Sequence, residues 1–164
     1  MKIETPTTIL VKRRAALGDV VMSTGVVREL YKKNNGKCSI TVETEFPLVY
    51  KNNPYIVDLR NWGECNSADY EVVYNLDDAY EHETDIHFVD SYFYRVFGDS
   101  NINKSVELFP NDADKSAIEA LKQQHGLDKY IVVHLRNWHW QAKNISMDVW
   151  FDVFTKLFEE RDDF

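Results

Sequence analysis

The chain has 164 residues and a formal net charge of −8, and 44% of its residues are hydrophobic. This composition supports a buried core and excludes a disordered chain. The acidic surplus argues against a nucleic-acid partner, because binding a polyanion requires clustered Lys and Arg. The sequence contains no apolar run of the roughly 20 residues that a membrane span needs. It also has no apolar signal segment near its N-terminus, so we expect a cytoplasmic protein.

Apolar, β-branched segments alternate with segments of helical periodicity along the chain. The former predict strands over residues 8–12, 38–44, 55–61, 69–77 and 130–135. The latter predict a helix capped by Asp19, a short helix within 46–53, and helices over 86–98, 112–126 and from Ser146 onward. This alternation is typical of an α/β fold, so we expect a Rossmann-like parallel sheet with helices on both faces.

The loop after the first predicted strand carries Arg13, Arg14, Gly18 and Asp19. Gly18 allows a tight turn or a close approach of ligand and backbone. Asp19 either caps the next helix or acts as a general base toward a hydroxyl group. The two arginines could contact a phosphate. The loop matches neither the GxGxxG nor the P-loop pattern, which argues against dinucleotide-binding or P-loop chemistry.

The loop after the fourth predicted strand is acidic, with four carboxylates and one histidine between Asp77 and Glu83. It could hold a metal or a sugar, or it could be a solvated acidic loop. Next along the chain, His87 and Asp90 are three residues apart and can share one face of the predicted helix.

A third polar loop follows the apolar segment 130–135 and contains Arg136, His139 and Lys143, with His134 just before it. Cationic groups ahead of a helix N-terminus favour an anion such as a phosphate. Trp138 and Trp140, in the same loop, could stack on a ring, or they could be buried parts of a surface loop. The histidines and cysteines lack zinc-site spacing, so we expect no structural metal.

Taken in order, these loops resemble the ADP-heptose:lipopolysaccharide heptosyltransferases, glycosyltransferase family nine. Gly18-Asp19-Val20, Thr24, Arg28 and Leu30 fit the family pattern of a Gly-Asp turn followed by a helix. The segment 72–98 is similar to the middle of the family's first domain. His134, Lys143 and Trp150 match the opening of its second domain, although Ile145-Ser146 stands where the family usually has Trp-Pro.

The resemblance implies a GT-B fold and inverting transfer of a sugar from a nucleotide-sugar donor to a hydroxyl of a glycan acceptor. It implies no metal or other cofactor, and a role in lipopolysaccharide synthesis. Asp19 would be the catalytic base and Lys143 would contact the donor phosphates. Substrate or phosphate binding would further involve Arg13, Arg14, Gly18, His134 and Arg136. Asp77, His87 and Asp90 would belong to a possible acceptor loop.

The resemblance also predicts the domain organisation. Residues 1–126 would form the acceptor-side Rossmann-like domain, and residues 127–164 would be the first strand and helix of a truncated donor-side domain. That segment would pack on the first domain, pair with another chain, possibly in a homo-oligomer, or continue in a longer protein. The alternative is a non-catalytic Rossmann-like module that binds a sugar, a nucleotide or a partner chain. A hydrolase or epimerase is a third interpretation, but the sequence offers no second catalytic pair for it.

Overall fold

The computed structural model describes residues 6–128, 130–135 and 144–161, and it divides into two compact units. The first unit is Met1–Asn111 and the second is Asp112–Phe164. The division falls earlier than the domain boundary expected after Gly126, so the helix that follows Asn111 groups with the second unit.

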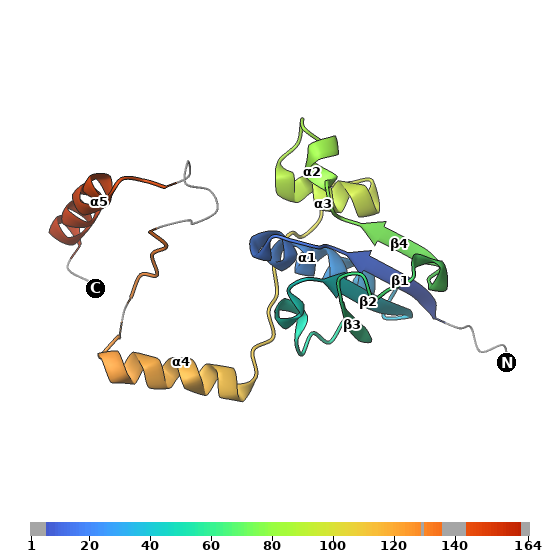
Figure 1. Ribbon diagram of the computed structural model, residues 1–164, viewed down its shortest axis with the longest axis horizontal. Helices are drawn as coiled ribbons and strands as arrows, with labels where there is room; N and C mark the ends of the chain where they lie inside the picture. Colours follow the sequence, from blue (N-terminus) through green and yellow to red (C-terminus); the bar gives the residue numbers. More distant parts are fainter. Residues whose placement is uncertain (1–5, 129, 136–143, 162–164) are drawn as a thin grey trace. The chain divides into compact units, whose positions relative to one another are not determined.

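The first unit is built on a parallel four-stranded sheet in the order β3-β2-β1-β4 (Figure 1). Its strands are β1 (Thr7–Lys12), β2 (Cys38–Thr44), β3 (Asp58–Asn61) and β4 (Val72–Asn75). Leu10 lies in register with Thr41 on one side and with Val73 on the other. The expected α/β fold with a Rossmann-like parallel sheet is therefore confirmed. β2 coincides with its predicted range, whereas β3 and β4 are shorter than predicted.

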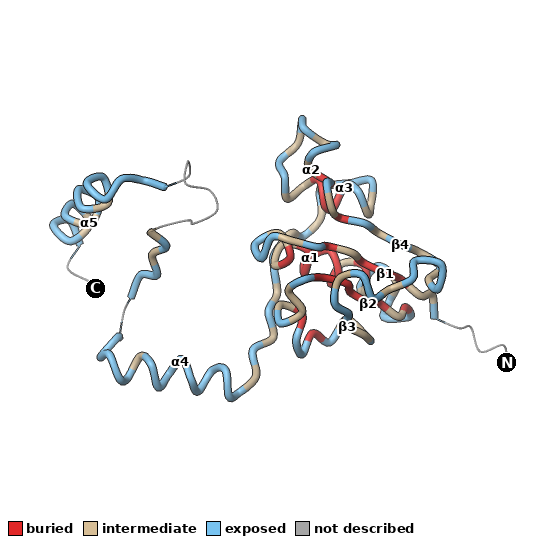
Figure 2. Tube along the Cα trace, in the orientation of Figure 1, coloured by how far each residue is buried: buried red, intermediate tan, exposed pale blue. Residues whose placement is uncertain are grey.

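Both faces of the central strands are covered. Successive residues of a strand point to opposite faces, yet Ile9, Leu10 and Val11 in β1 are all buried, and so are residues 40–44 of β2. This burial explains why both strands read as nearly continuous apolar or β-branched runs. Figure 2 shows the buried positions concentrated in β1, β2 and α1.

Helix α1 (Leu17–Lys33) connects β1 to β2 and begins earlier than the sequence suggested. The N-cap is Ala16, and Asp19 is the third residue of the helix. The expected N-cap role of Asp19 is therefore wrong. Its carboxylate instead accepts a hydrogen bond from the Ala16 amide at 3.2 Å, which satisfies one of the free donors at the helix start.

The rest of the first unit packs at the two ends of the sheet and on α1. A 3₁₀ turn, η1 (Pro47–Tyr50), stands where a short helix was predicted, and η2 (Ser67–Asp69) precedes β4. The short helix α2 (Ala79–His82) and α3 (Phe88–Phe97) follow β4, and Gly98 ends α3 with a φ of 67°, a conformation that favours glycine. Tyr92 and Phe93 of α3 are fully buried.

The segment after α3 is fastened to α1 by a buried arginine. Arg28 is 1% exposed and donates hydrogen bonds to the carbonyl oxygens of Asn103 and Ser105. The Glu107 amide also donates a hydrogen bond to the Thr24 hydroxyl at 3.1 Å. Thr24 and Arg28, which belong to the family-like pattern, thus both hold this segment in place.

The second unit contains α4 (Asp112–His125) and α5 (Met147–Glu160). The Ser146 hydroxyl accepts a hydrogen bond from the Val149 amide, which confirms the predicted N-cap. The expected strand at 130–135 is absent, since none of these residues has strand structure. A lone strand has no neighbour to satisfy its backbone groups, and the strands that the structure describes all belong to the other unit.

Candidate functional site

The candidate site lies at the carboxyl ends of β1 and β4. The chain winds from β1 outward through β2 to β3, and then places β4 on the other side of β1. Ligands of open α/β sheets bind at such a switch point, outside the carboxyl ends of the strands. The loops that begin at Arg13 and at Leu76 meet here: the amide of Leu76 donates to the Lys12 carbonyl at 2.8 Å.

Arg13 is the centre of the site and is 4% exposed. Its Nη2 atom lies 3.1 Å from Asp19 Oδ2, and its Nη1 atom lies 3.1 Å from Asp77 Oδ1. Nη1 also donates to the Leu76 carbonyl at 3.2 Å. The rings of Tyr92 and Tyr80 lie 5.4 and 5.8 Å from the guanidinium carbon, within the range of a cation–π contact.

Burial acts to lower the pKa of Arg13, but Tyr92, Asp19 and Asp77 outweigh it, so that the pKa is raised. The guanidinium therefore remains charged at any pH at which the protein folds. A buried cation shared by two carboxylates has little capacity left for a substrate phosphate.

Asp19 and Asp77 are both partly accessible, with side chains that are 18% and 19% exposed. Asp19 has the larger number of partners from other elements. Its Oδ1 atom accepts a 2.8 Å hydrogen bond from the Tyr92 hydroxyl. Its Oδ2 atom accepts a hydrogen bond from the Ala16 amide and forms the ion pair with Arg13. Burial, and next the hydrogen bond to Asp19, raise the pKa of Tyr92. Tyr92 thus stays protonated and acts as the donor. These contacts hold the Asp19 carboxylate in a fixed orientation at the carboxyl ends of β1 and β4.

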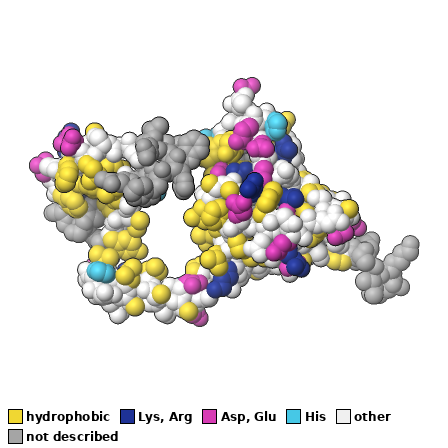
Figure 3. Space-filling view, viewed as in Figure 1, with side chains coloured by type: hydrophobic (Ala, Val, Ile, Leu, Met, Phe, Trp, Pro, Cys, Tyr) yellow, Lys and Arg dark blue, Asp and Glu magenta, His cyan; other side chains and the backbone are white. Residues whose placement is uncertain are grey.

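The other residues of the two first-unit loops are placed as follows. Gly18 is exposed in the first turn of α1, and a Cβ atom added there would meet nothing within 4 Å, so a ligand could approach its backbone. Arg14 is exposed; its side chain pairs with Glu45 at 2.9 Å, and its amide donates to Asp77 Oδ1. Figure 3 shows acidic and basic side chains intermixed on this unit rather than gathered by sign.

His87 and Asp90 belong to α3, and the structure gives each a local partner. His87 is the N-cap of α3, where its Nδ1 atom accepts from the Val89 amide at 3.3 Å. Asp90 forms an ion pair with Lys104. Of the three residues of the expected acceptor loop, Asp77 alone forms an ion pair with Arg13.

The third polar loop is mostly outside the described residues. His134 is described and exposed, in the second unit. Arg136 and Lys143, together with Trp138, His139 and Trp140, lie outside the described residues. Their expected contacts with donor phosphates stay predictions.

Sequence reasoning missed Tyr92 and Tyr80 as members of the site. Tyr92 is the last residue of the His-x-x-Asp-x-Tyr pattern in the family-like segment 72–98, but that pattern assigned it no role in the site. A tyrosine that is 0% exposed beside a carboxylate is the signal, and this signal exists only in three dimensions.

A second buried charge, the carboxylate of Glu43, lies near the carboxyl end of the neighbouring strand β2. The Glu43 side chain is fully buried; its Oε2 atom lies 2.8 Å from Lys12 Nζ. Its Oε1 atom accepts from the amides of Gly63 at 3.0 Å and Cys65 at 2.8 Å. Lys12 in turn lies 4.9 Å from the centre of the Trp62 ring. Glu43 therefore fixes the loop after β3.

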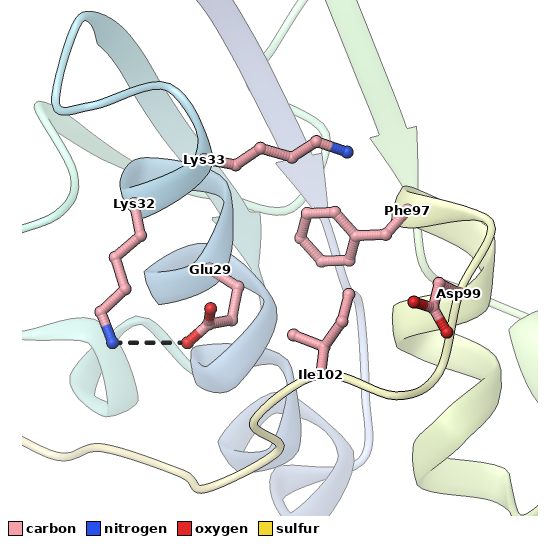
Figure 4. Close-up of a pocket in the computed structure, with 6 residues that line it drawn as sticks. All are labelled: Glu29, Lys32, Lys33, Phe97, Asp99 and Ile102. Carbon is pink, nitrogen blue, oxygen red and sulfur yellow. Dashed lines mark hydrogen bonds and ion pairs between the residues drawn. The ribbon is translucent and has the colours of Figure 1, made fainter.

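A cavity of the first unit lies away from this site (Figure 4). It has a volume of about 450 Å³ and is lined by Glu29, Lys32, Lys33, Phe97, Asp99 and Ile102. These residues come from the C-terminal halves of α1 and α3 and the segment after α3. Asp19 is in the first turn of α1 and Lys33 is its last residue, roughly 20 Å further along the helix at 1.5 Å per residue.

The described residues contain no group of three or more His, Cys, Asp or Glu side chains able to hold a metal ion. Among the described helices, none combines the length and apolar character needed to cross a membrane.

Comparison with solved structures shows a similarity in fold. The structure is similar to a crystal structure of a glycosyl transferase family 9 protein from Veillonella parvula DSM 2008, with a TM-score of 0.57 at 14% sequence identity. The match covers 84% of this chain and 58% of the other, so the chain spans little more than half of that protein's length. No family model and no curated protein matches the sequence. At this identity the likeness concerns the fold, and it confirms the expected glycosyltransferase-like α/β architecture.

Proposed function

We propose that the chain is the acceptor-side part of an inverting glycosyltransferase, with Asp19 as its catalytic base. The supporting observation is the geometry of Asp19: a partly exposed carboxylate at the switch point, fixed by Arg13, Tyr92 and the Ala16 amide. A general base must have a free lone pair and a fixed orientation toward the proton that it removes. The fold-level likeness to a glycosyl transferase family 9 protein supports the reaction class.

In this mechanism Asp19 takes the proton of an acceptor hydroxyl while that oxygen attacks the anomeric carbon of a nucleotide sugar. The new carbon–oxygen bond forms as the bond to the diphosphate breaks, and the diphosphate leaves with that electron pair. Attack from the opposite side inverts the anomeric configuration. Cationic groups beside the leaving diphosphate stabilise its developing charge. We assign this role to Lys143, with His134 and Arg136.

The second part of the proposal concerns domain organisation. We propose that residues 1–126 bind the acceptor and that residues 127–164 begin a donor-side domain, whose remainder is supplied by further chain or by a second polypeptide. The share of the Veillonella protein covered by the match, 58%, supports this assignment. So do the exposed apolar side chains of the second unit, such as Phe151 at 65% and Val132 at 85%, because isolated domains rarely leave so many uncovered. A heptose donor and a lipopolysaccharide acceptor are the specific substrates that the family resemblance suggests.

The test is release of nucleoside diphosphate from ADP-, GDP-, UDP- and CDP-activated hexoses and heptoses in the presence of short oligosaccharides. We expect Asp19→Asn to lower the rate by about 10²- to 10⁴-fold, the usual contribution of a general base. Asp58→Asn is the matched control, since Asp58 pairs with Arg60 in β3 and not with Arg13 or Asp19. If the wild-type chain turns over and Asp19→Asn retains full activity, Asp19 is not the base.

The alternative is a non-catalytic Rossmann-like module that binds a sugar, a nucleotide or a partner chain. It predicts no turnover with any donor and unchanged ligand binding in Asp19→Asn. It also predicts stable association with a second chain through residues 127–164. Size-exclusion chromatography with light scattering, together with nucleotide binding by calorimetry, distinguishes it from the enzyme.

A further inference from the structure

We infer that the rings of Tyr80 and Phe88 form an aromatic platform on which an uncharged sugar residue of the acceptor stacks, beside the hydroxyl that Asp19 activates. This inference rests on the proposed function, because it names the class of substrate that the same site takes. It adds Phe88 to the site and gives Tyr80 a contact with substrate. The two residues belong to α2 and α3, which pack against each other after β4 (Figure 1).

Four aromatic rings in mutual contact lead away from Asp19. The Tyr92 hydroxyl donates to Asp19, and the Tyr92 ring meets the Tyr80 ring with centres 6.2 Å apart and planes at 87°. The Tyr80 and Phe88 rings meet in the same edge-to-face manner, at 6.4 Å and 86°. The His87 ring follows, with its centre 4.5 Å from that of Phe88. Because edge-to-face pairs are favourable, each ring helps to fix the next one.

The exposure of these rings increases with their distance from Asp19 along the run. Tyr92 is 0% exposed, Tyr80 has intermediate exposure and Phe88 is 45% exposed. Tyr80 lies near the carboxylate, since burial, and next the charge of Asp19, raise the pKa of Tyr80. The aromatic platform therefore runs from the candidate base toward solvent, and a ligand can reach its outer end.

A sugar ring suits this surface. One face of a pyranose ring presents C–H groups, whose partial positive charge is attracted to the negative face of an aromatic ring. The hydroxyl groups lie around the edge of the sugar ring, so stacking leaves them free to form hydrogen bonds. Phe88 is separated from Asp19 by two other rings, so we expect it to hold the sugar residue next to the one that carries the reacting hydroxyl.

The charges at this end of the sheet favour an uncharged acceptor. The three cations at the carboxyl end of β1 all have carboxylate partners: Lys12 pairs with Glu43, Arg13 with Asp19 and Asp77, and Arg14 with Glu45. The loop that carries Tyr80 adds four further carboxylates between Asp78 and Asp85, and no lysine or arginine. A carboxylate or phosphate on the acceptor would therefore face a surplus of like charge, which disfavours its binding.

The experiment is a ligand-observed NMR titration of the full chain with three neutral disaccharides: methyl β-lactoside, methyl β-cellobioside and methyl α-maltoside. We expect at least one of them to receive saturation from aromatic protons of the protein at the C–H groups of one ring. The same disaccharides oxidised to carboxylates at C6 should bind at least about threefold more weakly. This difference should shrink as salt is added, because salt screens the acidic loop.

Substitutions at Phe88 separate stacking from simple apolar cover. Phe88→Ala and Phe88→Leu should both weaken binding by about three- to tenfold, because neither keeps a ring. Phe88→Trp, which keeps one, should bind at least as tightly as the wild type. Tyr94→Ala is the matched control, since Tyr94 is on the same helix and is 46% exposed. Amide spectra of each variant verify that it is folded.

Four results would overturn the inference. They are no binding of any neutral disaccharide, binding of the carboxylates as tight as that of the neutral forms, full binding by Phe88→Leu, and an equal loss in Tyr94→Ala. Each contradicts one step: the sugar, its lack of charge, the need for a ring, or the place of the ring.

The binding experiment and the turnover assay fail independently. If the neutral disaccharides bind through Phe88 but no donor is turned over, the aromatic platform exists and the proposed reaction is wrong. If turnover depends on Asp19 but Phe88→Ala leaves the KM for the acceptor unchanged, the base is correct and the aromatic platform is wrong. Where both hold, Phe88→Ala should raise the acceptor KM by about three- to tenfold and leave kcat and the donor KM nearly unchanged, because stacking contributes equally to the ground state and the transition state.

Discussion

The two units of this chain contain equally convincing amphipathic segments, yet only one of them buries its apolar residues. In the first unit, Val20 and Val27 of α1 and Ile40 of β2 are all 0% exposed. In the second unit, neither α4 nor α5 contains a buried residue, although both helices lie entirely within the described residues. Figure 2 shows this contrast along the chain. A periodic pattern is thus sufficient for a helix to form, but burial requires a partner surface.

The second unit does gather apolar side chains locally. Trp150, Phe154 and Phe158 follow one another along α5, with ring centres 5.5 and 6.5 Å apart. A cavity of about 220 Å³ lies between this helix and the preceding segment, lined by Leu127, Tyr130, Ile131, Val133, Phe154, Leu157 and Phe158. These contacts are partial, because Phe158 remains 63% exposed.

The largest expected effect is a loss of stability when a buried phenylalanine of the first unit is truncated, compared with an exposed phenylalanine of the second unit. Phe93 is fully buried in α3, so Phe93→Ala should destabilise the protein by about 4 kcal/mol through lost burial and a residual cavity. Phe151 is 65% exposed, so Phe151→Ala should cost less than about 1 kcal/mol. Urea unfolding followed by circular dichroism measures both. Similar losses for the two variants would show that the second unit is buried against a partner in solution.

The next largest effect should come from Arg28. Replacing it with Met keeps most of the volume but leaves the carbonyl oxygens of Asn103 and Ser105 without their buried donor. We expect a loss of about 3 kcal/mol and faster hydrogen exchange of the Glu107 amide, which bonds to Thr24. Lys32→Met is the control on the same helix, since Lys32 is 54% exposed. Unchanged exchange at Glu107 in Arg28→Met would contradict the fastening role of Arg28.

A smaller, pH-dependent effect is expected at Glu43. Burial acts to raise the pKa of Glu43, but Lys12 and the amides of Cys65 and Gly63 outweigh it and lower the pKa. A carboxyl group whose pKa falls on folding stabilises the protein above its unfolded value of about 4.3, and this stabilisation is lost as the pH drops through the folded value. Glu43→Gln should therefore be less stable than the wild type at pH 7, and the gap should close as the solution is acidified.

Thermal unfolding of both proteins between neutral and acidic pH measures this gap. Glu81→Gln is a control from α2, where the side chain is exposed. A gap that stays constant with pH would mean that Glu43 acts by shape rather than by charge.

The smallest effect is expected from removing the second unit. The core of the first unit, including the residues packed against it, extends from Ile9 to Ile102. A chain that ends at Asn111 should therefore keep the amide spectrum of residues 6–102 and change its unfolding temperature by only a few degrees. A collapsed spectrum would show that the two units fold together.

Much of the fold could be predicted from the sequence, because its signals are local. The apolar run 38–44 predicted β2, the Gly98 stop ended α3 correctly, and Ser146 was identified as an N-cap. The errors also have local causes. Asp19 suits an N-cap by residue type, yet the N-cap is Ala16, three residues earlier, and Asp19 is the third residue of the helix. The segment 130–135 has the composition of a strand, but a strand also needs a neighbour, which composition does not reveal.

The sequence by itself determined the α/β alternation and the polar residues of each loop, because periodicity and loop composition act over a few neighbouring positions. Only the tertiary structure decided that Arg13 lies between Asp19 and Asp77, and that Tyr92 donates to Asp19 across a separation of 73 residues. The physical reason is the strand order. Placing β4 beside β1 brings the two loops together, and that order results from packing of the whole sheet rather than from any one segment.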